Sequence, residues 1–397
     1  MSSMQSERLK IAYITTTDAS DKHSWSGTHH YIWKTTQKNI GDVTLLGPVS
    51  APFAVFICQL IHGFSLYVLK KRFNYRDSVF MSKIYGRIFS KKLRKGKFDL
   101  IFAPAGSANV AYLNTHIPIV SIADRTIQST LNYHLVLTNL LDFSKKQSIG
   151  VDKKAIEKSC IAIYSSEWAA QSAIVDYQIA KDKVFVIPFG ANLDEIPSRA
   201  TALSRTKGKR CNLLFLGVSW ENKGGAIALD TLIHLIKLGI PAQLTVCGCM
   251  PPEDVRHPNM TIIPFLNKND AAQKKQLDDL LLNNNFLILP TRFDCTPIVF
   301  CEAGAYGLPC IAPVTGGIAS VITEGVNGML VPYDAKGEVY AEKIKNAFED
   351  EHKYNALIIS SRDNYEARLN WDSWAASVNK LIHEQLRLTQ GSRLGSN

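Results

Sequence analysis

Two carboxylates eight residues apart are the side chains with the clearest chemical potential in this sequence. Asp294 and Glu302 lie within PTRFDCTPIVFCEAGAYGLP (290–309), after the apolar run 286–289 and next to a helix-like run. A carboxylate at a strand's end and a second at a helix start lie where open α/β sheets bind ligands. Carboxylates accept hydrogen bonds from hydroxyl groups, and the backbone amides of 295–299 suit a phosphate, although Pro297 lacks an N–H. The pattern predicts a ligand with hydroxyls and phosphates, as a sugar nucleotide has.

A second candidate is the segment GVSWENKGG (217–225), which follows the apolar run 212–216 and precedes a helical pattern. Its glycines let the backbone approach a phosphate at a helix N-terminus, and Lys223 supplies a cation for a diphosphate. Each residue also has an ordinary interpretation. In that interpretation Lys223 is a solvated lysine in a plain turn. Asp294 is a loop or capping residue, and Glu302 is an ordinary helix residue. The surrounding pattern, with Gly pairs and Asn-Gly further on, favours the binding site.

These residues require a scaffold, and the 397-residue chain is long enough for two domains. Apolar runs alternate with helical patterns in both halves, which is typical of doubly wound, mainly parallel α/β sheets. We predict a first Rossmann-like domain at 1–197, a polar linker at 198–210 and a second Rossmann-like domain at 211–371. An amphipathic helix at 372–386 is expected to cross back onto the first domain.

The net charge of +10 comes from one segment of the chain. Residues 70–97 carry eleven Lys or Arg and one acid, Asp77, so the remainder is neutral on balance. A basic segment of this kind suits the anionic surface of a membrane. Nucleic acid is its other common partner, but no recognition motif accompanies it. The apolar run 52–69 is at the lower limit for a membrane span, and we interpret it as a buried or interfacial helix.

The cysteines and the N-terminus carry less information. The eight cysteines form no C-x-x-C pair and have no spacing typical of zinc, so no metal site is predicted and a reducing cytoplasm is the simpler compartment. No D-x-D triplet indicates a bridging divalent metal, and no cofactor is predicted. The polar stretch 1–10 has no apolar run of the kind that a signal peptide needs.

The motif of the second half resembles that of the family-4 retaining glycosyltransferases, which have the GT-B architecture of two Rossmann-like domains facing a central cleft. The family's E-x7-E is Asp294-x7-Glu302 here, followed by EAGAYGLP, a Gly pair and Asn-Gly. Its lysine before a glycine is Lys223. The resemblance extends to SWSGT (24–28), IYSSEW (163–168) and VIPFGAN (186–192), and so covers most of residues 8–385.

The resemblance implies a role for each matching residue. Lys223 would bind the donor diphosphate, Glu302 the ribose and Asp294 the transferred sugar, while Asp124 lies where many members have a histidine facing that sugar. The implied catalytic residues are therefore Asp124, Asp294 and Lys223. The donor would be bound by Gly27, Lys223, Phe265, Leu266, Asp294, Cys295, Thr296, Pro297, Ile298 and Glu302, and Thr28 and His29 would lie near the acceptor.

Three departures from the family pattern concern the donor site. The first acid is Asp294 instead of glutamate and is one methylene shorter. The arginine five residues before the lysine is replaced by Val218, which leaves the diphosphate one cation short. The glycine after the first acid is replaced by Pro297.

These observations lead to an expected function with two alternatives. The resemblance implies a metal-independent, retaining transfer of a hexose-type sugar from a UDP- or GDP-linked donor to a glycan or lipid-linked acceptor, in bacterial surface polysaccharide synthesis. The protein would be cytoplasmic and peripheral on the inner face of the plasma membrane, held through 70–97. The alternatives are a catalytically weakened nucleotide-sugar-binding subunit, and another GT-B enzyme such as a sugar-nucleotide epimerase or a phosphorylase.

Overall fold

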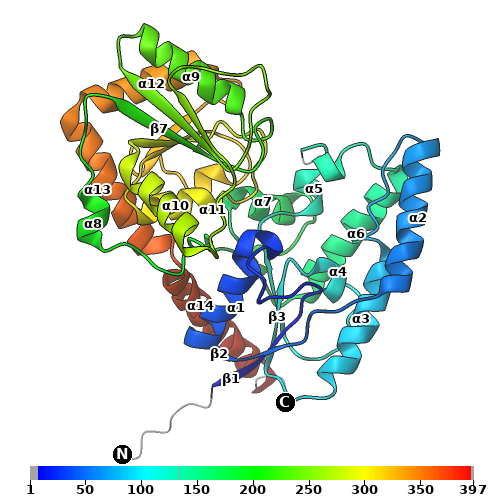
Figure 1. The fold of residues 1–397 in the computed structure, drawn as a ribbon. Helices are drawn as coiled ribbons and strands as arrows, with labels where there is room; N and C mark the ends of the chain where they lie inside the picture. Colours follow the sequence, from blue (N-terminus) through cyan, green and yellow to red (C-terminus); the bar gives the residue numbers. More distant parts are fainter. Residues whose placement is uncertain (1–7, 134, 395–397) are drawn as a thin grey trace, which may run out of the picture. The chain divides into compact units, whose positions relative to one another are not determined.

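A computed structural model describes residues 8–133 and 135–394 of the chain. The chain divides into two compact units (Figure 1). Unit 1 contains the residues up to Ile187 together with those from Trp374 onward, and unit 2 is Pro188–Ser373. The chain returns to unit 1 within its last helix, α14 (Trp371–Leu394).

Unit 1 contains a six-stranded sheet in which all neighbouring strands are parallel, in the order β2-β1-β3-β4-β5-β6. Its strands are β1 (Leu9–Tyr13), β2 (Gly41–Leu45), β3 (Leu100–Pro104), β4 (Ile119–Ala123), β5 (Ile161–Tyr164) and β6 (Val184–Val186). Its helices are α1 (Thr28–Asn39), α2 (Pro52–Val68), α3 (Val79–Leu93), α4 (Ser107–Val110), α5 (Ile127–Thr130), α6 (Asp142–Lys158) and α7 (Glu167–Val175), with short 3-10 helices η1 (Ser24–Gly27), η2 (Leu135–Leu137) and η3 (Lys181–Lys183).

Unit 2 contains a second parallel sheet, in the order β12-β11-β10-β7-β8-β9. Its strands are β7 (Cys211–Leu216), β8 (Ala242–Cys247), β9 (Met260–Ile263), β10 (Phe286–Ile288), β11 (Cys310–Pro313) and β12 (Gly328–Val331). Its helices are α8 (Arg199–Leu203), α9 (Gly225–Lys237), α10 (Ala271–Asn283), α11 (Ile298–Ala305), α12 (Gly337–Glu349) and α13 (Glu351–Arg368), with the 3-10 helix η4 (Ile318–Ser320). The prediction of two doubly wound parallel sheets is confirmed.

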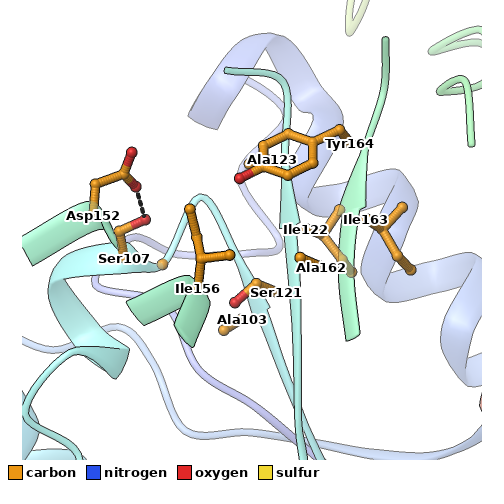
Figure 2. A pocket seen from close by; sticks show the side chains of 11 residues that line it. Ala103, Ser107, Ser121, Ile122, Ala123, Asp152, Ile156, Ala162, Ile163 and Tyr164 are labelled. Carbon is orange, nitrogen blue, oxygen red and sulfur yellow. Dashed lines mark hydrogen bonds between the residues drawn. The ribbon is translucent and has the colours of Figure 1, made fainter. Parts of the chain in front are cut away.

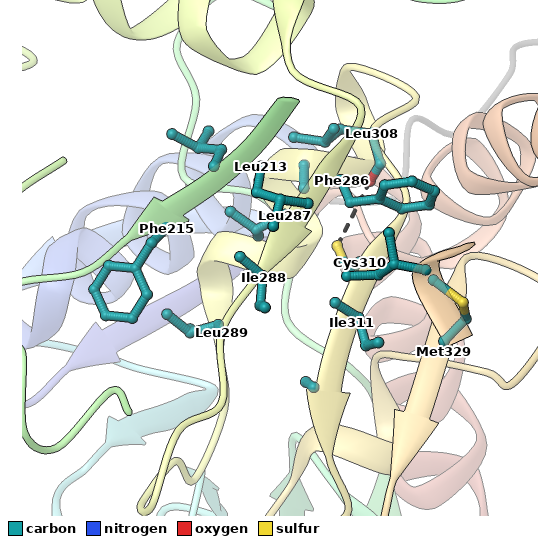
Figure 3. Close-up of a cluster of buried hydrophobic side chains, with 14 of the residues drawn as sticks. Leu213, Phe215, Phe286, Leu287, Ile288, Leu289, Leu308, Cys310, Ile311 and Met329 are labelled. Atoms are coloured by element: carbon teal, nitrogen blue, oxygen red, sulfur yellow. Dashed lines mark hydrogen bonds between the residues drawn. The ribbon is translucent and has the colours of Figure 1, made fainter. Parts of the chain in front are cut away.

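Continuous apolar runs form the central strands of unit 2 because helices cover both faces of a parallel sheet. Leu213, Phe215, Leu287 and Ile311 are fully buried in one cluster that spans β7, β10 and β11 (Figure 3). This packed sheet holds the ends of its strands at fixed positions, and the loops that carry the candidate site begin there.

The boundary between the units lies earlier than the predicted linker. Residues 198–210 belong to unit 2 and contain α8. Arg199 pairs with Asp363 at 2.5 Å, and the Arg205 guanidinium donates to the carbonyl oxygen of Leu281 at 2.6 Å. The polar composition of this segment therefore reflects hydrogen bonding to its own unit, and composition alone does not distinguish such contacts from a linker.

The long apolar run of the sequence forms α2. Among the described residues, no helix combines the length and the apolar character that crossing a bilayer requires.

Candidate active site

The candidate residues of unit 2 lie where two of its loops meet, at the carboxyl ends of the neighbouring strands β7 and β10. The sheet extends from this pair in opposite directions, through β8 and β9 on one side and β11 and β12 on the other. The Arg292 amide donates to the Asn222 carbonyl oxygen at 2.8 Å. Gly224 has a φ of 75°, and a Cβ on it would lie 2.0 Å from the carbonyl oxygen of Pro290, so only glycine allows the loops this close. Such a switch point is where doubly wound sheets bind ligands.

Lys223 and Asp294 are in contact at this switch point. Lys223 is carried by the loop before α9, and Asp294 by the loop between β10 and α11. The Lys223 Nζ donates to the Asp294 Oδ2 at 2.5 Å, and most of both side chains is shielded from solvent. The Asp294 carbonyl oxygen also accepts from the Gly317 amide at 3.2 Å. The structure thus brings together the two residues that the sequence assigned to a diphosphate and a sugar.

Glu302 lies in the second turn of α11, further into the helix than the sequence suggested, and its side chain is almost fully buried. Its Oε1 accepts from the Nζ of Lys268 at 2.6 Å. Lys268 was not among the predicted site residues. The signal that could have found it is its position three residues after Phe265, in the loop that carries the donor-site predictions Phe265 and Leu266. Both acids of the motif are therefore paired with a lysine.

The remaining donor-site predictions of unit 2 lie on the loop between β9 and α10 and on the passage from β10 into α11. Phe265 is mostly exposed, whereas Leu266 packs against the core. Cys295 and Pro297 are buried, and Pro297 is the residue that precedes the first turn of α11. The Ile298 amide donates to the carbonyl oxygen of Thr296 at 3.0 Å, so this amide of the predicted phosphate cradle has a partner in its own turn.

The predicted residues of unit 1 gather around the turn before α1. Three consecutive residues, Trp25, Ser26 and Gly27, have positive φ values of 50°, 54° and 87°. Two of them are not glycine, and such conformations persist only where the surroundings hold them. The Trp25 Nε1 donates to the Oδ2 of Asp124, just after β4, at 3.2 Å. The turn and Asp124 are therefore joined by a contact between residues 99 apart in the chain.

Thr28 and His29 are the first residues of α1, and both are buried. The Tyr13 hydroxyl donates to the His29 carbonyl oxygen at 3.0 Å and lies 3.1 Å from the His29 Nδ1. The ring of Trp25 lies 5.2 Å from the His29 imidazole, between centroids. Burial lowers the pKa of His29 to about 4, because desolvation disfavours the charged ring. His29 is therefore neutral near pH 7.

A small cavity in unit 1 contains a further buried acid (Figure 2). The Asp152 carboxylate accepts from the Ser107 Oγ at 2.6 Å, the Ile127 amide at 2.7 Å and the Tyr177 hydroxyl at 2.9 Å. Burial raises the pKa of Asp152, and these hydrogen bonds oppose that rise. Because the three donors come from α4, α5 and the chain that follows α7, Asp152 ties these three segments to α6. Its role in the unit is structural.

Within 8–133 and 135–394, no three His, Cys, Asp or Glu side chains lie close enough together to hold a metal ion.

Comparisons with known proteins agree with this fold. Residues 210–350 match the family described as glycosyl transferases group 1. The YtcC protein of Bacillus subtilis (strain 168), named provisionally as a glycosyltransferase, is 22% identical over 76% of this chain and 76% of its own length. An uncharacterized 41.2 kDa protein of the cps region of Klebsiella pneumoniae is 22% identical over 64% of this chain and 70% of its own. The solved structure of HepE from Anabaena, in complex with UDP and glucose, has a TM-score of 0.60 at 14% identity and covers 96% of this chain and 100% of that one.

The chain thus has the GT-B fold, with two parallel α/β sheets of six strands each. The matched family segment contains Lys223, Lys268, Asp294 and Glu302. Fold and family match together support a glycosyltransferase.

Proposed function

We propose that this protein is a retaining, metal-independent glycosyltransferase that transfers a sugar from a UDP- or GDP-linked donor to a glycan or lipid-linked acceptor. The observation that carries the proposal is the contact between Lys223 and Asp294 at the β7/β10 switch point of unit 2. A cation and an acid at that position match the diphosphate and the hydroxyl groups of a sugar nucleotide. Glu302, buried in the adjoining helix, has a second carboxylate oxygen in addition to the one that Lys268 holds, and ribose hydroxyls would donate to it.

The transfer requires stabilisation of charge on the leaving diphosphate. As the bond from the anomeric carbon to the donor phosphate breaks, the electron pair goes to the phosphate oxygen, and the sugar becomes cationic. Lys223 would move from Asp294 to that oxygen, where a positioned cation lowers the barrier most. Asp294, released from the lysine, would accept hydrogen bonds from the sugar hydroxyls. In a retaining transfer the acceptor oxygen attacks on the face from which the diphosphate departs, and its proton passes to the phosphate oxygen that has received the electron pair.

Asp124 is the acid of unit 1 that we assign to the transfer. It accepts from Trp25 through one oxygen, Oδ2. In this role Asp124 would stabilise the positive charge that develops on the sugar ring, and the turn at 25–27 would fix its orientation. Thr28 and His29 follow that turn, and we propose that the acceptor binds next to them in unit 1.

The proposed setting is bacterial surface polysaccharide synthesis on the cytoplasmic side of the plasma membrane. The support is the basic segment 70–97, whose Lys83, Arg87, Lys91, Arg94 and Lys95 are exposed. Cations on a surface attract anionic lipid headgroups. A lipid-linked acceptor would lie in that membrane.

The direct test is to incubate the protein with a set of UDP- and GDP-sugars and measure release of the nucleoside diphosphate. Glu302→Ala should weaken donor binding and lower turnover with it. Lys275→Gln is a matched control, because Lys275 belongs to an exposed pair with Asp279 on the same unit. Thermal shift with UDP and GDP reports binding separately from turnover, since a ligand of the folded state raises its apparent stability.

A weakened binding subunit is the second candidate, and the departures at 218, 294 and 297 favour it. Val218 stands where the family has an arginine. Its side chain is exposed and apolar, so position 218 supplies no cation to a diphosphate. Binding of a nucleotide without release from any sugar donor would support the subunit and contradict the enzyme. An altered free sugar nucleotide, or dependence on phosphate, would instead identify an epimerase or a phosphorylase.

A further inference from the structure

Helix α2 of unit 1 turns its large apolar side chains toward solvent. Phe53, Phe56, Leu60, Phe64 and Tyr67 are 76%, 57%, 58%, 64% and 80% exposed. Their spacing of three and four residues places them on one side of the helix. An ordinary surface helix buries this side against its own core.

The opposite side of α2 is buried and consists of small or polar residues. Ala54, Cys58 and Ser65 are the buried residues of the helix. The Ser65 Oγ donates to the Lys71 carbonyl oxygen at 2.7 Å, and the His62 Nδ1 lies 2.9 Å from the Phe73 carbonyl oxygen. These contacts fix the rotation of α2 about its axis. The exposure of its apolar side is therefore built into the fold of unit 1.

The exposed apolar surface continues onto a second segment of the same unit. Leu135, Val136 and Phe143 are each at least half exposed. The chain near them pairs with the residues that follow α2, because the Arg72 amide donates to the Asn139 carbonyl oxygen at 2.8 Å. The rings of Phe73 and Phe143 stack with their centroids 5.6 Å apart. We call α2 and residues 135–143 together the apolar rim; α2 itself lies along the outer side of unit 1 (Figure 1).

The charge beside the apolar rim indicates what covers it. No Asp or Glu occurs between Asp42 and Asp77, whereas Lys70, Lys71 and Arg72 follow α2 directly. The one acid of the rim is Asp142, whose Oδ2 lies 4.0 Å from the Lys71 Nζ, so the cations remain in excess. The Lys70 Nζ lies 5.3 Å from the centre of the Tyr67 ring, at the end of the apolar side. A second copy of α2 on this surface would offer these cations no Asp or Glu to pair with. Anionic headgroups attract them.

We propose that α2 lies in the plane of an anionic membrane surface, with its exposed apolar side inserted between headgroups and acyl chains. Its 17 residues are at the lower limit for a membrane span, and its side-by-side apolar and polar faces suit a helix that lies in the interface. This proposal deepens the membrane association proposed above, because it assigns the contact to α2 and not to the basic segment alone. Phe73 and Phe89 of that segment are buried, which leaves Phe80, half exposed, as its one phenylalanine at the surface, whereas α2 exposes five large apolar side chains in one row.

Flotation with vesicles tests the proposal. The full chain is mixed with vesicles of phosphatidylcholine alone or with about one-third phosphatidylglycerol, at low and high salt. We expect binding to the anionic vesicles, and a loss of about tenfold or more in the triple variant Phe56→Ser, Leu60→Ser, Phe64→Ser. The matched control is Val175→Ser, Met250→Ser, Ile359→Ser, which replaces three exposed apolar residues outside the rim. That control should bind as the wild type does.

A charge variant and two further measurements separate the alternatives. Lys70→Gln, Lys71→Gln, Arg72→Gln should remove the preference for anionic vesicles and the salt dependence. Equal binding by the serine variant and the wild type would overturn the role of α2, and so would a wild-type dimer, seen by light scattering, that the serine variant abolishes. Thermal shift with UDP and GDP is run on every variant. A chain that floats but binds no nucleotide contradicts the proposed enzyme and leaves the role of α2 intact.

Discussion

The two sheets have the same number of strands but differ in strand order and in the groups at their ends. Unit 2 extends three strands to each side of its switch point, between β7 and β10, whereas in unit 1 only β1 and β2 lie on one side. At the switch point of unit 2, Lys223 pairs with Asp294, and Lys268 pairs with Glu302 in the adjoining helix. The corresponding region of unit 1 holds Trp25 and a neutral His29 around one acid, Asp124.

This difference matches the ligands that we propose for the two regions. A nucleoside diphosphate carries negative charge and needs a cation that is present before the charge develops, and a lysine held by an acid satisfies this without leaving either group unpaired. A glycan or the neutral part of a sugar offers hydroxyls and apolar faces, and aromatic rings and uncharged nitrogens suit these. The comparison predicts that replacing a charged residue lowers turnover most in unit 2. It also predicts that proton uptake at His29 lowers the stability of unit 1.

The largest expected effect is that of Lys223→Met. Removing a donor that stabilises a developing negative charge costs about 10²–10³ in turnover. The measurement is nucleoside diphosphate release under saturating donor, with Lys275→Gln as the control. Lys223→Arg keeps the charge and should retain more activity than the methionine variant.

Loss of stability is the alternative explanation for such a result, because Lys223→Met leaves the Asp294 carboxylate without its ion-pair partner. Removing one member of a buried pair is strongly destabilising. The double variant Lys223→Met, Asp294→Asn removes that unpaired charge and should recover the melting temperature. If it also recovers turnover, Lys223 acts only as a structural partner of Asp294, and the contrast between the units loses its chemical meaning.

How far the sequence predicts this arrangement depends on how local each contact is. The strands of both sheets follow from apolar runs such as 212–216, and the meeting of Lys223 with Asp294 follows from parallel strands whose carboxyl ends share one edge. Lys268 and Glu302 are 34 residues apart, and Trp25 and Asp124 are 99 apart. Nothing in their local sequence fixes the loop conformations that bring them together, so these contacts were not predicted.

The run 52–69 shows a second limit of prediction from sequence, namely which side of a helix is buried. Its composition predicts a buried or interfacial helix, but the choice depends on which side packs against the unit. His62 and Ser65 decide that orientation through hydrogen bonds to the chain at 71–73, and these are set by tertiary structure. The helices α12 and α13 and the strand β12 were also not predicted. The strand is only four residues long, Gly328–Val331, and begins with glycine.

The next effect tests the neutral character of unit 1 through the pH dependence of stability. The folded pKa of His29 is about 4, below its ordinary value of 6.5, so the unfolded chain binds the proton more tightly. The stabilising contribution is therefore present above pH 6.5 and is lost as the pH falls toward 4. Between pH 7 and pH 5 we expect the wild type to lose about 2 kcal/mol of unfolding free energy relative to His29→Gln.

Urea unfolding of both proteins at several pH values gives this difference directly, and other titrating groups cancel in it. His29→Gln is uncharged at every pH, so its stability should follow only the remaining groups. Parallel pH profiles for the two proteins would mean that His29 takes up a proton as easily when folded as when unfolded. The surroundings of Trp25 would then tolerate a charged side chain, as the switch point of unit 2 does.

The smallest effect concerns Lys268, which holds one oxygen of Glu302 and acts as a positioning residue. Lys268→Gln should raise the KM for the donor by about tenfold and change kcat little, because it alters how the ribose is held and not the bond that breaks. Lys268→Arg keeps the ion pair and should recover most of the lost affinity, whereas Lys275→Gln should change nothing.

Affinities for UDP and for its 2′- and 3′-deoxy analogues separate positioning from general electrostatics. If Lys268 orients Glu302 toward the ribose, the glutamine variant discriminates less between UDP and these analogues. If the variant weakens all of them by the same factor, Lys268 contributes only positive charge, and the pairs Lys223–Asp294 and Lys268–Glu302 serve the phosphates alone.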